Sequence, residues 1–362
     1  MKRIIIFIVP FILLILICVP VCVSAEDNID FSCHEIYEDI DDILRESDIG
    51  VSSEQISDPD ISFLISEMKE RLSGMTAAPV KLLAAIITVI ILSAFVKDAL
   101  HSSDKDIYGM ICVLSSVTVI FPALFEVYGR ALGSVGRTGG FITVFVPVFA
   151  GVTAAMGNIS AAGIYNILIL AMSELMVTVT DNYLMPVISI VTVLAISGSI
   201  FSDTSLEKLT SLLKKIIVWG MTAIMTLFTG FVTMKCTIAG KADSVATKTV
   251  KFALSGFVPI VGGAVSDAYS TVRGSFDIIR TSIGTIGTTA LMIIMLPPVI
   301  EIMIYRLVMW ISSAAAELFS VGPVVKLLNA LDCGLAIAQS VLVCFSVVFV
   351  LCSGILLNCC SD

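Results

Sequence analysis

Three ionisable side chains stand in or beside long apolar runs of the sequence. Glu174 lies inside one run, and Glu301 and Arg306 lie near the end of another. A charged group inside a membrane is energetically costly, so such residues mark ion or substrate pathways, or they pair. Glu301 and Arg306 are five positions apart, which on a helix permits a loose pair or lets each side chain reach the membrane surface. Glu174 has no sequence-local partner, so it either lines a polar cavity or bonds to a neighbouring helix.

Residue types for enzyme chemistry are sparse in this chain. It has 2 histidines, and neither stands in a metal-ligand spacing. Neither a Gly-x-Ser-x-Gly nucleophile motif, nor a Gly-x-x-x-x-Gly-Lys phosphate loop, nor a zinc-binding helix motif occurs. The sequence therefore predicts a protein that is not an enzyme and that has neither cofactor nor metal site. Work that needs ATP would then depend on a partner.

The elements that position these side chains are predicted to be membrane-spanning helices. Hydrophobic residues make up 57% of the chain and charged residues 14%, against roughly 25% charged in soluble domains. The apolar runs are long enough to cross a bilayer, and backbone inside lipid must satisfy its own hydrogen bonds, which favours helices. Two less apolar stretches, 252–283 and 306–332, are candidates for segments that dip into the membrane without crossing it. The expected spans are 79–96, 108–125, 141–157, 163–181, 183–200, 216–234, 285–304 and 336–357.

The membrane domain, 79–362, also carries signs of an internal repeat. Two matches share one offset of 112 residues: Phe145-Val146-Pro147 with Phe257-Val258-Pro259, and Pro186 with Pro298. We therefore expect candidate repeats at 108–200 and 216–312. Discontinuous helices in such repeats are typical of transporters and channels. The predicted fold class is an all-α polytopic membrane protein of about seven to nine helices, a broken-helix bundle with a small helical N-terminal domain outside the cytoplasm.

The N-terminal part reads as a leader followed by an exported acidic segment. Residues 1–25 have a basic start, an apolar stretch and a small-residue end, which predicts a signal peptide cleaved after Ala25; an uncleaved first span is the alternative. Residues 26–78 hold 15 of the 30 acids and three bases, which argues against nucleic-acid binding and for export. With this segment outside, the stretches 97–107 and 201–215 are cytoplasmic. The lysines from Lys235 to Lys251 then lie outside, against the positive-inside tendency.

The most distinctive stretch runs from Thr249 to Val272 and reads TVKFALSGFVPIVGGAVSDAYSTV. It resembles the signature of the stage III sporulation protein AE family, as do Gly322-Pro323-Val324 and Leu331-Asp332. The resemblance covers nearly the whole chain, whereas the exported segment is similar only in character. In the signature we single out Lys251, Pro259, Gly262 and Asp267, because the proline and glycine interrupt a helix and the two charges flank the interruption.

The resemblance implies a role in spore formation. Members of the family are expected in the mother-cell membrane around the engulfed forespore. They belong there to a multiprotein channel, similar to specialised secretion systems, with the other stage III A proteins, a separate ATPase and a forespore-side partner. No catalytic residues are implied. The complete set of candidate functional or packing residues is Lys251, Phe257, Pro259, Gly262, Gly263, Asp267, Phe145, Pro147, Glu174, Glu301 and Arg306.

Three functions remain open at this point. The first is a membrane subunit of the sporulation channel. The alternative is a self-sufficient secondary transporter, in which polar residues of both repeats would converge on one cavity. The third is a structural anchor, which would show a closed apolar bundle with a large lateral interface.

Overall fold

A computed structural model describes residues 74, 76–99, 105–200, 204–257 and 262–359, and the secondary structure within them is helical. The leader and nearly all of the acidic segment lie outside these residues. No strand occurs in the described ranges, and the prediction of an all-α polytopic membrane protein is confirmed. The helices are α5 (Ala77–Ala99), α6 (Lys105–Ala155), α7 (Ile159–Val179), the π-helix η1 (Thr180–Leu184), α8 (Met185–Ile200), α9 (Thr204–Phe257), α10 (Gly262–Leu318) and α11 (Gly322–Cys359).

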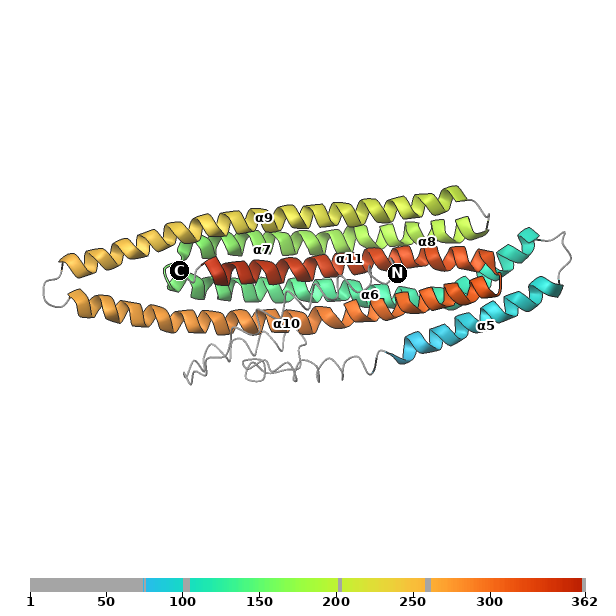
Figure 1. The fold of residues 1–362 in the computed structure, drawn as a ribbon, viewed down its shortest axis with the longest axis horizontal. Coiled ribbons are helices and arrows are strands. Elements are labelled where there is room, and N and C mark those ends of the chain that lie inside the picture. The colour runs from blue at the N-terminus through green and yellow to red at the C-terminus, as the bar shows by residue number, and fades with distance from the viewer. Residues whose placement is uncertain (1–73, 75, 100–104, 201–203, 258–261, 360–362) are drawn as a thin grey trace.

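The helices form an elongated bundle whose members run alternately in opposite directions along one axis (Figure 1). Helix α11 packs against α10, α9, α8, α6 and α7, so it occupies the centre. Helix α5 packs only against α6 and α10 among the well-contacted pairs, so it lies at the outside. The chain therefore builds one bundle from sequential antiparallel neighbours, with the last helix inserted among the earlier ones.

The described residues contain 6 helical segments long and apolar enough to cross a membrane, where the sequence predicted eight spans. The expected spans 108–125 and 141–157 lie in the single helix α6, and 163–181 and 183–200 lie in the continuous segment α7–η1–α8. The residues between the first two, 126–140, are rich in glycine and polar groups and resemble a loop. They are helical because tertiary contacts override this weak local preference: Arg130 bonds to α10 and Gly139 packs against α7.

Prolines within the apolar runs interrupt the helices less than the sequence suggests. Pro122 and Pro147 lie inside α6, and Pro297 and Pro298 lie inside α10, without ending either helix. The irregular segment is η1, which comes directly before the turn that contains Pro186. A proline has no N–H for the preceding turn, and a local widening to a π-helix accommodates this loss.

Three of the helices are far longer than a bilayer is thick. Helices α6, α9 and α10 have 51, 54 and 57 residues. At about 1.5 Å per residue they measure roughly 75–85 Å, against about 30 Å for a hydrocarbon core. Large parts of these helices must therefore lie outside the hydrocarbon.

The hairpin of α9 and α10 projects beyond the other helices at one end of the bundle (Figure 1). Asp243 on α9 accepts hydrogen bonds from the backbone N–H groups of Ser160 and Ala161, at 3.0 Å each, and so fixes the level at which α7 begins. Helix α9 continues from there to Phe257, which adds about 20 Å of projecting helix. The stretch 252–283, which was expected to dip into the membrane without crossing it, includes the end of α9 and the beginning of α10.

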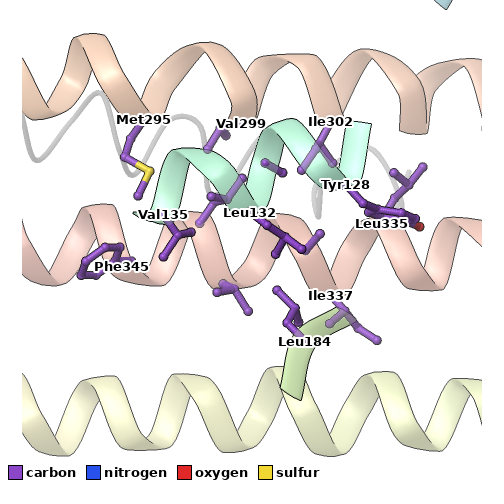
Figure 2. Packing of buried hydrophobic residues seen from close by; sticks show 14 of the residues in the cluster. Tyr128, Leu132, Val135, Leu184, Met295, Val299, Ile302, Leu335, Ile337 and Phe345 are labelled. Atoms are coloured by element: carbon purple, nitrogen blue, oxygen red, sulfur yellow. The ribbon is translucent and has the colours of Figure 1, made fainter. Parts of the chain in front are cut away.

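Aromatic rings of α6 fill the centre of the apolar core. Phe141, Phe145 and Phe149 stack on one another with centroids 5.2 and 5.7 Å apart, and Phe149 meets the edge of Tyr165 on α7. Nearer the beginning of α6, the side chains of Tyr128, Leu132 and Val135 lie between residues of α10 and α11 (Figure 2). A Cβ atom on Gly287 of α10 would overlap the ring of Phe145, so this glycine allows α10 to approach α6 closely.

Alanine at Gly287 is expected to destabilise the bundle by about 1–3 kcal/mol, the usual range for overpacking a filled core. Gly354→Ala is the matched control, because a Cβ atom there meets nothing within 4 Å. That change should be neutral or slightly stabilising, since alanine favours a helix over glycine. Thermal unfolding of the purified chain in detergent measures both changes. Equal midpoints for the two variants would contradict the close contact with Phe145.

Candidate functional site

The first charged group inside the bundle joins α6 to α10. Glu301 is almost fully buried, with a side chain 5% exposed, and Arg130 is half-buried. The Arg130 Nε atom lies 3.0 and 3.2 Å from the two carboxylate oxygens of Glu301, and Nη2 also donates to Oε1. Nη1 of Arg130 donates to the exposed Glu126 one turn earlier. Both carboxylate oxygens of Glu301 are thus engaged in a bidentate pair, a geometry that specifically suits arginine.

The second charged group joins α10 to α11. Nε of Arg306 donates to Oδ1 of Asp332 at 2.7 Å, and Nη2 donates to Oδ2 at 3.3 Å. Nη1 donates to the side-chain carbonyl of the buried Gln339 at 2.6 Å. Removal of Asp332 would leave a buried cation without its counter-charge, which is costly at this depth.

The two charged groups lie close together along the bundle axis. Glu301 and Arg306 are little more than one turn apart on α10, and each pairs with a different helix. They do not pair with each other, so the interpretation as a loose pair is wrong, whereas their reach to the membrane surface stays a prediction. Tyr128 belongs to the same region, since a Cβ atom on Gly334 of α11 would lie 2.7 Å from its hydroxyl. Together these residues form a charged belt that ties α6, α10 and α11 together.

Glu174 behaves differently from the two paired residues. It is exposed on the outer side of α7, and it has no hydrogen-bond or ion-pair partner among the described residues. It therefore neither lines the bundle interior nor bonds to a neighbouring helix of the same chain. A second exposed charge, Arg137, lies on the outer side of α6, where its guanidinium donates to the hydroxyl of Ser134 at 2.9 Å.

The signature residues gather at the projecting tip. Lys251 is half-buried near the end of α9, and Asp267 is exposed near the beginning of α10. Phe257 is the last residue of α9, and Gly262 and Gly263 open α10. Pro259 lies between them, outside the described residues. The two charges therefore stand on either side of the segment that joins α9 to α10.

The other half of the predicted repeat has a different setting. Phe145 is buried in the middle of α6, and Pro147 is exposed on the opposite side of the same helix. Phe257 instead ends a helix at the tip of the molecule. The matching motifs thus lie in unlike surroundings, and the duplication stays a prediction from sequence.

Several residues of the charged belt escaped the sequence analysis. Arg130 stands in the glycine-rich stretch between two expected spans, and Tyr128 stands beside it. Asp332 drew notice only as part of a family motif, and Gln339 not at all. One feature of the sequence could have indicated the pair of Arg130 and Glu301. An arginine between two apolar runs needs an acidic partner, and Glu301 is an acid beside an apolar run.

Comparison with known proteins identifies the family to which the chain is similar. The family model described as stage III sporulation protein AE matches residues 40–359. The stage III sporulation protein AE of Bacillus subtilis (strain 168) is 22% identical over 247 residues, which cover 68% of this chain and 61% of that protein. The matched part thus spans less than two thirds of this relative, and no solved structure matches the chain. Because the family model covers most of the chain, including the signature tip and the charged belt, the chain belongs to the stage III sporulation protein AE family.

Proposed function

We propose that the chain is a membrane subunit of a transenvelope channel complex that acts in spore formation between mother cell and forespore. Family membership supports the sporulation role. The observation that carries the proposal is the hairpin of α9 and α10, which projects beyond the bundle and bears the signature stretch at its tip (Figure 1). Exposed apolar residues on this hairpin, among them Phe252 at 79% and Val245 at 65%, suit it to bind another protein of the complex.

A self-sufficient secondary transporter is the second candidate. It requires polar groups of both repeats around a site near the middle of the membrane. Arg130 and Glu301 come from the two candidate repeats, but they bind each other, and both carboxylate oxygens of Glu301 are occupied. A closed pair of this kind locks α6 to α10 and leaves neither of these two charges free for a substrate. The pairing therefore favours a subunit over a transporter.

The orientation follows from the alternating direction of the helices. The beginning of α5, the turn between α6 and α7, the tip of α9 and α10 and the end of α11 all point the same way (Figure 1). We place the acidic segment outside the cytoplasm of the mother cell, so the tip also lies outside, facing the forespore membrane. Its partners in this proposal are the other stage III A proteins, including a separate ATPase on the cytoplasmic side, and a forespore-side channel protein.

A reporter fused after Asp362 tests this orientation. With six crossings and an exported segment before the first, we expect the C-terminus outside the cytoplasm. Alkaline phosphatase fused there should be active, because it folds only outside, and green fluorescent protein should be dark. The opposite pattern would place the tip in the cytoplasm and would agree with its lysines instead.

Gene deletion in the spore-forming host tests the function itself. Heat-resistant spores should be lost while vegetative growth stays normal, and an intact copy should restore them. Forespore-specific late reporter expression should fall in the same cells. Normal spore counts in the deletion strain, with the protein proven absent, would move the assignment to an independent transporter.

A further inference from the structure

The outer side of α6 carries a row of glycines that no side chain or helix of the described residues covers. Gly129, Gly133, Gly136 and Gly140 are all exposed, and a Cβ atom added to any of them would meet nothing within 4 Å. Their spacing of four, three and four residues places them on one face of the helix. In membranes, such faces let another helix approach closely, and close approach is what drives helices together there.

Two opposite charges stand on either side of this row. Gly139 faces α7, since its Cβ atom would lie 2.5 Å from Val177, so α7 borders one side of the row. Arg137 is two residues earlier, a rotation that turns it about 160° away from Gly139, to the side opposite α7. Glu174 lies on the exposed side of α7. The order across the surface is therefore Glu174, the glycines, then Arg137.

Both charges lie at nearly the same height along the bundle. The contacts of Gly139 with Val177 and Ser173 bring the turn of Arg137 level with the turn of Glu174. Exposed apolar residues lie nearby, with Val144 41% exposed, Leu175 48% and Ile167 70%. Neither charge has an ionic partner among the described residues. Charges in such surroundings are expected to find a partner or to line water.

We propose that a second copy of this chain packs against the outer face of α6 and α7, related to the first by a two-fold axis parallel to the helices. A two-fold interface places each patch against itself, so every contact occurs twice. The rotation exchanges the two sides of the glycine row. Glu174 of each copy then faces Arg137 of the other, at the same height, while the two rows of glycines meet between them.

The self-complementary order of the charges is what favours a second copy over a different protein. A foreign helix would need an acid and a base placed at matching positions, whereas this chain already supplies both. The dimer also gives an ionic partner to Glu174, which has none among the described residues. This inference is independent of the proposed sporulation function.

Charge reversal gives the decisive test, with the full chain reconstituted in lipid vesicles at low density and its stoichiometry counted by single-molecule photobleaching. Wild type should be mainly dimeric. Glu174→Arg alone opposes two arginines at each contact, and Arg137→Glu alone opposes two glutamates, so each variant should lose most of its dimers. Mixed together, the two variants should recover dimers that contain one copy of each, because both contacts then join opposite charges.

Glycine variants probe the same face without altering charge. Gly133→Leu together with Gly140→Leu should abolish the dimer, because the bulky side chains hold the backbones apart. Gly220→Leu on α9 is the matched control, since Gly220 is exposed and its Cβ atom also meets nothing within 4 Å. All variants should keep the thermal midpoint of a folded chain. A monomeric wild type, or single charge variants that dimerise fully, or a mixture that fails to recover would each overturn the proposal.

Discussion

Replacement of Arg130 by methionine is expected to lower the free energy of unfolding by about 3–5 kcal/mol, the usual cost of breaking a buried ion pair. The variant keeps most of the apolar length of the side chain but leaves Glu301, 5% exposed, without its counter-charge. Three hydrogen bonds to the carboxylate disappear with the guanidinium. The loss comes mainly from the stranded acid rather than from the missing attraction.

The double variant Arg130→Met with Glu301→Leu distinguishes these two contributions. It should recover most of the stability, because a buried pair replaced by apolar groups of similar volume is often neutral. Arg273→Met on the projecting hairpin is the control, since no ion pair of Arg273 occurs among the described residues. Thermal or denaturant unfolding in detergent measures all three. If the double variant is as unstable as the single one, the pair is not what holds α6 to α10.

Removal of the projecting tip should abolish spore formation while leaving the bundle folded. Replacement of residues 249–270 by a short Gly-Ser turn shortens the hairpin but keeps Asp243, which fixes the start of α7, and Arg280, which donates to the carbonyl of Leu357. The removed part belongs to the hairpin that projects beyond the other helices, and it exposes residues such as Phe252. Heat-resistant spores should fall to the level of the deletion strain, with normal amounts of protein in the membrane.

Point variants refine this result. Lys251→Ala and Asp267→Asn alter the two charges that flank the turn, and each should reduce sporulation at normal protein level if the tip is a binding surface. Lys208→Ala, an exposed lysine at the other end of α9, is the matched control. Wild-type spore counts in the tip-deleted strain would show that the signature serves only to shape the hairpin.

The sequence predicted the helical membrane class and the first and last spans well. The expected span 79–96 lies within α5, and 336–357 lies within α11, because each is a single apolar run bounded by polar residues. It failed at 126–140, where five glycines and three charges have the composition of a loop. This stretch is helical because it contacts α7 and α10, and local helix propensity does not reveal such contacts.

The candidate site was predicted only in part, because it too depends on contacts between residues far apart in the sequence. Glu301 and Arg306 were recognisable as charges in apolar surroundings, but their partners were not. Arg130 precedes Glu301 by 171 residues and Asp332 follows Arg306 by 26. Only the packing order of the helices decides which distant residues meet, whereas the sequence suggested the neighbour five positions away.

Two buried charges on α10 enclose a stretch long enough to cross a bilayer. Arg280 and Glu301 enclose residues 281–300, an uncharged stretch of twenty. Such a stretch measures about 30 Å, the thickness of a hydrocarbon core. Helix α5 lies beyond this stretch, because Lys97 near its end donates to the backbone carbonyl of Ser320 in the turn between α10 and α11, at 3.0 Å. Apolar helix therefore extends along more of the bundle than one hydrocarbon core is thick, and tilt of the bundle or local thickening of the bilayer would accommodate the excess.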